Sequence, residues 1–189
     1  MDRSRAVWRG AAGALLLACA AAVAGTGVNI AVDATTAATR GYNQFEGDEA
    51  ALTDGLYPGN SDGATTFAWP NKGNLTFHFE EPRQVSGLRV YVGENGGGYQ
   101  ATAYLGACLG ADGQTDASQA VVVADTVNFD FAENAWAELP FPPETTADFI
   151  VLATESGAVF YEVQILSDAA GGPSAVMPAT WGAAKLWMR

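Results

Sequence analysis

The sequence contains only two cysteines, Cys19 and Cys108, and a single histidine, His78. Cys19 lies in an N-terminal leader, so one thiol would remain after export, and one thiol cannot form an intramolecular disulfide. Because His78 lies in the middle of a predicted strand and no cysteine pair accompanies it, the sequence gives no support for a histidine-based metal centre or a Ser–His–Asp set. Cys108 has no basic or histidine neighbour in the sequence to activate it. We therefore expect Cys108 to be a small buried apolar residue rather than a nucleophile.

Basic residues are also scarce, because the chain has nine Lys and Arg against 21 Asp and Glu. Removal of residues 1–24 would take away three basic residues and one acidic residue. This leaves six basic and 20 acidic residues, a net charge of −14. A body this acidic is repelled by phosphate backbones and by anionic membrane surfaces. The charge therefore excludes nucleic acid as a partner.

The N-terminal apolar run, Ala11–Ala24, is shorter than the roughly 20 residues that a membrane-spanning helix requires. It follows three arginines and closes on Ala22-Val23-Ala24, the small-residue pattern of a signal peptidase site. We predict that residues 1–24 are a signal peptide of a bacterial protein that is secreted or held at the cell surface. Two alternatives stay open: the run is an uncleaved membrane anchor, or Leu16–Cys19 is a lipoprotein signal that places a lipid on Cys19.

No stretch of 12 or more residues holds a helical period, whereas apolar and polar residues alternate along most of residues 64–167. Leu75, Phe77 and Phe79, for example, share one face of an extended strand. The alternation predicts an all-β fold, a single β-sandwich or jelly roll of about eight strands.

The boundaries of this domain follow from composition. We assign residues 1–24 to the signal peptide, 25–168 to the sandwich, and 169–189 to a Gly/Pro linker with a short tail. Within the sandwich, the glycine-rich segment Glu94–Gly98 predicts the turn of a hairpin between strands at residues 88–92 and 99–105.

Seven short motifs span roughly residues 28–167 in a distinctive order. They are Val28–Ala31, Ala50–Gly55, Thr65–Trp69, Leu75–Phe79, Val85–Tyr91, Phe149–Leu152 and Tyr161–Leu166. Their order and spacing resemble the discoidin group, also called the coagulation factor 5/8 type C group. The resemblance implies a galactose-binding-like jelly roll, commonly non-catalytic, with ligand-binding loops at one end. In bacteria such modules often bind carbohydrate.

The same resemblance implies a structural Ca²⁺ near an Asp-Gly turn and a glutamate of the last strand. In this sequence those positions are Asp54 and Glu162, with Thr66 as a further candidate ligand. Hard cations take several oxygen ligands, and the acidic segment 40–63 offers them. The alternative is that these carboxylates are solvated surface groups.

A sugar site requires aromatic faces and a few polar side chains on loops. We select Trp69 and Tyr57 as stacking platforms and Arg40 and Asn95 as hydrogen-bonding partners. Two further loop aromatics, Tyr42 and Tyr99, complete the candidate set. For each aromatic the alternative is packing in the core or at its rim.

Two other functional classes remain. A polysaccharide-active enzyme is the weaker one, because the acidic residues cluster in polar loops rather than in an apolar pocket that would raise one carboxyl pKa. The other is a structural or adhesive surface protein retained through its tail, where Trp181, Leu186 and Trp187 lie near basic residues. The preferred partner is a glycan or cell-surface polysaccharide, and the oligomeric state stays open.

Overall fold

The computed structural model describes residues 27–38, 45–70, 72–94, 97–109, 115–154 and 157–168. The predicted signal peptide, the predicted tail, Arg40, Tyr42 and Asn95 lie outside these ranges. Within them the only helical segments are two 3-10 turns, η1 (Ala31–Asp33) and η2 (Glu49–Thr53), and no helix has the length and hydrophobicity needed to span a membrane. The remaining regular structure is β-strand.

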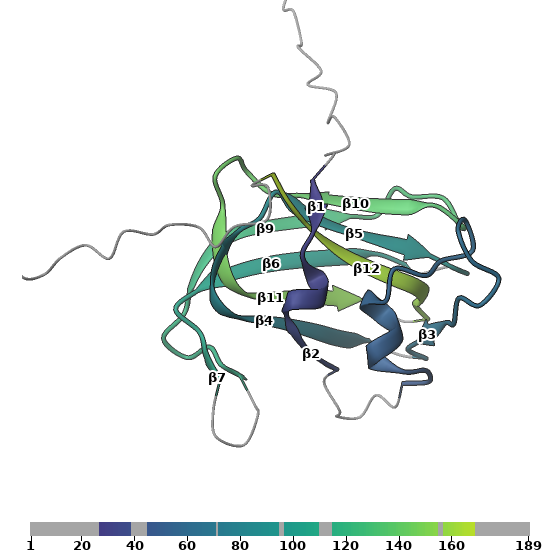
Figure 1. Ribbon diagram of the computed structural model, residues 1–189, viewed down its shortest axis with the longest axis horizontal. Coiled ribbons are helices and arrows are strands. Elements are labelled where there is room, and N and C mark those ends of the chain that lie inside the picture. Colours follow the sequence, from purple (N-terminus) through teal and green to yellow (C-terminus); the bar gives the residue numbers. More distant parts are fainter. Residues whose placement is uncertain are drawn as a thin grey trace, which may run out of the picture.

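Two antiparallel sheets lie face to face (Figure 1). The first sheet has the order β1-β12-β5-β10, with β3 also pairing β12, and the second has the order β2-β4-β11-β6-β9. A small β7-β8 ladder stands apart from both. The strands are β1 (Val28–Asn29), β2 (Thr35–Ala38), β3 (Phe67–Ala68), β4 (Gly73–Gln84), β5 (Gly87–Val92), β6 (Tyr99–Leu105), β7 (Cys108–Leu109), β8 (Thr115–Asp116), β9 (Val121–Asn128), β10 (Trp136–Pro140), β11 (Thr146–Thr154) and β12 (Val159–Ser167).

The sandwich prediction is confirmed, and eight of the strands in the described residues have four residues or more. The core lies between the sheets because each strand turns its apolar positions inward. Leu75, Phe77 and Phe79 of β4 are buried, as the alternation predicted, and Val90 of β5 and Val163 of β12 are buried on the first sheet. Removal of this apolar area from water is the main stabilising contribution to the fold.

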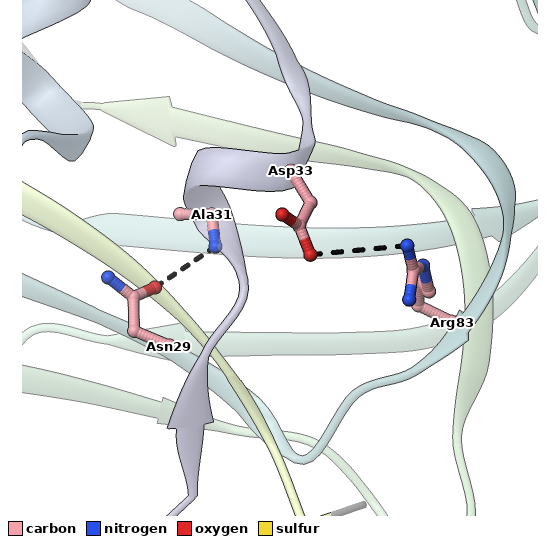
Figure 2. A network of polar contacts seen from close by, with 4 residues as sticks. All are labelled: Asn29, Ala31, Asp33 and Arg83. Carbon is pink, nitrogen blue, oxygen red and sulfur yellow. Dashed lines mark hydrogen bonds and ion pairs between the residues drawn. The ribbon is translucent and has the colours of Figure 1, made fainter. Parts of the chain in front are cut away.

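The N-terminal segment connects the two sheets, since β1 pairs with β12 in the first and β2 pairs with β4 in the second. Between them, the Asn29 side chain accepts a hydrogen bond from the Ala31 amide at 3.0 Å, and a carboxylate oxygen of Asp33 lies 4.0 Å from an Arg83 nitrogen on β4 (Figure 2). Asn29 also accepts from the Ile165 amide of β12 at 3.2 Å. One short turn is thus tied to both layers.

The predicted hairpin between residues 88–92 and 99–105 is wrong. Strand β5 pairs with β12 and β10 in the first sheet, whereas β6 pairs with β11 and β9 in the second. The connection after β5 therefore crosses from one layer to the other. Strands that face each other across a core show the same alternation as strands paired within a sheet, so the pattern could not separate the two arrangements.

Cys108 also departs from expectation, because it is exposed. It lies in the β7-β8 ladder, outside the two main sheets. Since this ladder does not contribute to the sandwich, its small apolar residue is not drawn into the core.

Several strands meet at the end of the sandwich where β11 terminates, which we call the loop end. The end of β11, Thr154, is opposite Gly73, the first residue of β4, and opposite Tyr99, the first residue of β6. Tyr99 in turn is opposite Asn128, the last residue of β9. The long connection from η2 to β3 reaches the same end (Figure 1). The predicted gathering of loops at one end is therefore present.

Candidate functional site

Trp69 and Tyr99, two of the predicted sugar-contacting aromatics, are buried at the loop end. Trp69 is 0% exposed, and its ring lies edge-on to Phe67 with centroids 5.0 Å apart. Tyr99 is 1% exposed and lies edge-on to Phe160 at 6.1 Å. The prediction that Trp69 acts as an open stacking platform is therefore wrong, whereas Tyr99 as a further ligand-binding candidate stays a prediction. The end of a sandwich core must be closed against water, and large aromatic side chains beside the loops do so.

Tyr57 is half-buried and packs on the outer face of the first sheet. Its ring centroid lies 4.8 Å from that of Tyr91 on β5 and 5.0 Å from that of Trp136 on β10. The Arg89 guanidinium carbon stands 4.4 Å from the Trp136 ring centroid, within cation–π range. These contacts fix the segment 54–66, which follows η2, against the sheet. Tyr57 as a sugar ligand stays a prediction, as do the roles of Arg40, Tyr42 and Asn95, which lie outside the described residues.

The structure brings Asp54 and Glu162 together. Glu162 on β12 is fully buried, and both of its carboxylate oxygens accept from the Gly55 amide at 3.2 Å. Burial, with a smaller contribution from the nearby Asp54 carboxylate, raises the pKa of Glu162 to about 8 against the opposing effects of the Gly55 amide, Gln164 and Arg89. An ionised Glu162 is therefore costly in the absence of a nearby cation.

Thr66, the third predicted metal ligand, is exposed and directly precedes β3. Its carbonyl oxygen faces Gly47, where a Cβ would lie only 2.6 Å away. No three His, Cys, Asp or Glu side chains gather into a metal-binding group within the ranges that the structure describes. A cation beside Asp54 and Glu162 would therefore take further oxygens from main-chain carbonyls, hydroxyls or water, which a hard cation accepts.

A pocket of about 220 Å³ opens on the outer face of the second sheet at the loop end. Its floor follows one row of the sheet, in which Ala153 of β11 is opposite Asn74 of β4 and Gln100 of β6, and Gln100 is opposite Val127 of β9. The remaining lining residues are Lys72, Gly98, Tyr99, Phe129 and Thr154. We call this concavity the row pocket.

Phe129 gives the row pocket an exposed aromatic ring, because 66% of its surface is accessible. The ring lies on Gly98, where a Cβ would come within 2.2 Å of a ring carbon, so the glycine allows this approach. Tyr99 also lines the pocket, and its buried hydroxyl has no hydrogen-bond partner among the described residues. Sequence reasoning missed Phe129 because its alternation with Asn128 and Asp130 indicated an ordinary strand position.

A larger concavity of about 610 Å³ lies between β2 and η2. Its polar lining includes Asp48, which caps η2 by accepting from the Ala50 amide at 3.0 Å. The aromatic residue in its lining, Phe45, is stacked on Phe67 with centroids 4.9 Å apart and contributes to the core. The larger concavity therefore lacks the open aromatic face of the row pocket.

No protein-family model and no curated protein matches the chain. Solved structures do. A fucose-binding module of Streptococcus pneumoniae has a TM-score of 0.54 at 15% identity, with 75% of this chain and 96% of the module covered. The chain has the galactose-binding-like β-sandwich fold.

Two further solved structures agree with this fold. The S. pneumoniae fucose-binding module SpX-3 has a TM-score of 0.53 at 10% identity, covering 74% of this chain and 98% of the module. A chitosan-binding module from a chitosanase/glucanase of Paenibacillus sp. IK-5 has a TM-score of 0.51 at 12% identity, covering 74% and 99%. The fold that the sequence motifs implied is confirmed.

Proposed function

We propose that this domain is a non-catalytic glycan-binding module and that the row pocket is its sugar site. The observation that carries the proposal is the exposed Phe129 ring beside the amides of Asn74 and Gln100 and the Lys72 side chain. An aromatic face stacks on the apolar side of a sugar ring, while amide and ammonium groups bind its hydroxyls. Binding of fucose and chitosan by modules of the same fold supports this reading.

Binding without catalysis agrees with the chemistry of the pocket. Among the residues that the structure describes, those lining the pocket include no carboxylate, imidazole or thiol, the groups that most often transfer protons or attack the substrate in sugar-cleaving enzymes. The closely placed carboxylates, Asp54 and Glu162, lie against the first sheet, whereas the pocket opens on the outer face of the second. The described lining of the pocket therefore supports recognition of a sugar rather than its cleavage.

A structural Ca²⁺ at Asp54 and Glu162 forms the second part of the proposal. A buried carboxylate with a strongly raised pKa and a second carboxylate nearby is the donor chemistry that suits a hard cation. The ion would neutralise both groups and secure segment 54–66. Thr66 remains a candidate ligand of this ion that only the family resemblance implies.

The cellular setting is inferred from the sequence. A cleaved signal peptide would export the domain to the cell surface or the surrounding medium, where glycans are available as partners. The acidic charge of the mature chain suits neutral or cationic polysaccharides better than strongly anionic ones.

Glycan-array screening followed by titration calorimetry tests the sugar site. Phe129→Ala should weaken binding about tenfold or more, because it removes the stacking face while leaving the core intact. Val32→Ala is the matched control, since Val32 on η1 is 64% exposed and lies outside the pocket lining. Equal affinities of Phe129→Ala and wild type would remove the row pocket from consideration, and the absence of any glycan ligand would defeat the proposed function.

A further inference from the structure

The outer face of the second sheet continues beyond the row pocket along β4, β11 and β6, which lie side by side (Figure 1). Core residues such as Leu75, Leu152 and Ala101 are buried, so the residues that alternate with them lie on the outer face. On the first sheet, by contrast, Tyr57 packs over the outer face with segment 54–66. The row pocket is therefore one end of a longer surface.

Three successive rows of side chains cross this surface, each with an apolar residue on the central strand β11 and a residue with a polar group on either side. The rows are formed by Asn74, Ala153 and Gln100, then by Thr76, Val151 and Thr102, and then by His78, Phe149 and Tyr104. The first row is the floor of the row pocket. All of these residues except Phe149 are exposed or half-buried. We call the second and third rows the β11 strip, which has an apolar centre and two polar rims.

The far end of the β11 strip is aromatic. The ring centroid of Phe149 lies 5.7 Å from that of Tyr104 and 6.5 Å from that of His78. Phe149 is only 5% exposed between them, so the half-buried Tyr104 and His78 rings form the accessible surface. The third row is four residues from the first along each strand, which corresponds to about 14 Å. This distance is longer than one sugar ring, so the whole surface has room for several rings.

The polar rims of the β11 strip are positioned by hydrogen bonds within the sheet. On one rim, the Thr76 hydroxyl donates to the Ala37 carbonyl of β2 at 3.1 Å. On the other, the Oδ1 atom of Asp125 on β9 accepts from Gln100 at 2.9 Å and from Thr102 at 2.7 Å. Within the described part of the chain, no hydrogen bond uses the second carboxylate oxygen of Asp125, and the residue is exposed. Both hydroxyls and this oxygen can therefore accept hydrogen bonds from a ligand while their present bonds persist.

We propose that the row pocket and the β11 strip form one extended binding surface for several consecutive units of a linear polysaccharide, with the sugar chain running along β11. This inference rests on the proposed glycan function and specifies its substrate class. A sugar chain has apolar ring faces flanked by hydroxyls, which match an apolar centre between two hydrogen-bonding rims. Phe129 in the row pocket and Tyr104 in the third row would hold the sugar chain at two separate places.

The composition of the surface favours a sugar chain over a protein partner. The centre of a protein interface is typically formed by large apolar and aromatic side chains, whereas the accessible centre here consists of Ala153 and Val151. Among the described residues of the surface, Lys72 is the one lysine or arginine, and Asp125 offsets its charge. The acidic body then disfavours a ligand that carries carboxylate or sulfate groups. We therefore assign the surface to polysaccharides without acidic groups.

The test compares sugar hexamers with monosaccharides by titration calorimetry and NMR titration on residues 25–189. The probes are linear hexamers of glucose, galactose and glucosamine and the three parent monosaccharides. Wild type should bind at least one hexamer about thirtyfold more tightly than its monosaccharide, which exceeds the statistical gain from six equivalent units. Tyr104→Ala should remove most of this preference and leave the monosaccharide affinity unchanged. Tyr161→Ala is the matched control, because Tyr161 is also a half-buried tyrosine but lies on β12 of the first sheet.

Two further variants separate a direct contact from a structural effect. Val151→Lys places a long side chain over the middle row and should weaken hexamer binding at least tenfold while sparing the monosaccharide. Tyr104→Phe keeps the ring and should retain the hexamer preference. Circular dichroism and the monosaccharide affinity check that each variant is folded.

The possible failures are distinguishable. If wild type shows no preference for hexamers, or if a folded Tyr104→Ala or Val151→Lys variant retains it, the extended surface is refuted while the row pocket remains a sugar site. Tighter binding of a galacturonic acid hexamer than of the three hexamers above would overturn the assignment to chains without acidic groups. Absence of binding to every hexamer and every monosaccharide would count against the glycan function itself, and the extended surface would fail with it.

Discussion

The buried Glu162 carboxylate gives the domain a pH dependence that can be worked out from the structure. Burial, the leading cause, raises the pKa of Glu162 from the ordinary 4.5 to about 8. The native protein therefore holds a proton that the unfolded chain releases near pH 4.5. Without a metal, this group contributes its full stabilisation below about pH 4.5, and the contribution is lost as the pH rises through about 8.

The magnitude follows from the size of the shift. Each pKa unit corresponds to about 1.4 kcal/mol, so a shift from 4.5 to about 8 corresponds to about 5 kcal/mol of unfolding free energy. That is a large part of the stability of an ordinary domain. A cation at Asp54 and Glu162 would oppose the loss, because it binds the ionised carboxylate and stabilises the native state by mass action.

Urea unfolding in EDTA at about pH 5 and about pH 9 measures this effect. Wild type should be less stable at the higher pH, whereas Glu162→Gln, whose side-chain oxygen can still accept from Gly55, should change much less. Glu80→Gln on β4 is the control, because Glu80 is exposed. Added Ca²⁺ should restore wild type and not Glu162→Gln. A wild-type protein with equal stability at both pH values in EDTA would refute the reasoning about Glu162.

Gly98→Ala should weaken sugar binding with little loss of stability, since the new Cβ displaces the exposed Phe129 ring. Calorimetry measures the affinity and thermal unfolding measures the stability, and an unchanged affinity would count against Phe129 as the stacking platform. Gly73→Ala should destabilise the domain by about 3 kcal/mol, because its Cβ would lie 2.1 Å from the buried Trp69 ring; an unchanged urea midpoint would contradict this. Trp69→Ala should cost about 3–5 kcal/mol in the same assay and reduce sugar binding only as far as it unfolds the protein. Tyr57→Ala should cost about 1 kcal/mol and increase proteolysis within residues 54–66, and a segment as resistant as in wild type would show that Tyr57 does not anchor it.

Alternation was sufficient to predict the layers of this fold. Leu75, Phe77 and Phe79 are buried as expected, because a strand against a core must turn every second side chain inward. Pairing was harder to predict, because β5 and β6 occupy facing sheets and facing strands alternate in the same way as paired ones. Local pattern therefore identified strands and left their partners undetermined.

The residues of the candidate site were likewise only partly predictable from the sequence. The proximity of Asp54 and Glu162, separated by more than 100 residues, came from the family resemblance, since no local pattern relates them. Trp69 was misassigned because an aromatic residue next to a loop can either close the core or face a ligand, and its sequence neighbours are the same in both cases. Phe129 was missed because its contact with Gly98, which comes from another connection, is a tertiary contact that no local pattern shows.

Two tryptophans of the sandwich lie in different surroundings, so their intrinsic fluorescence should report on two different structural changes. Trp136 is half-buried beneath the Arg89 guanidinium with Tyr57 at its edge, whereas Trp69 is sealed inside the molecule. The fluorescence of Trp136 should change when segment 54–66 detaches from the first sheet. The fluorescence of Trp69 should change only when the whole domain unfolds. With the tryptophans outside the sandwich replaced, one fluorescence spectrum could separate local release from global unfolding.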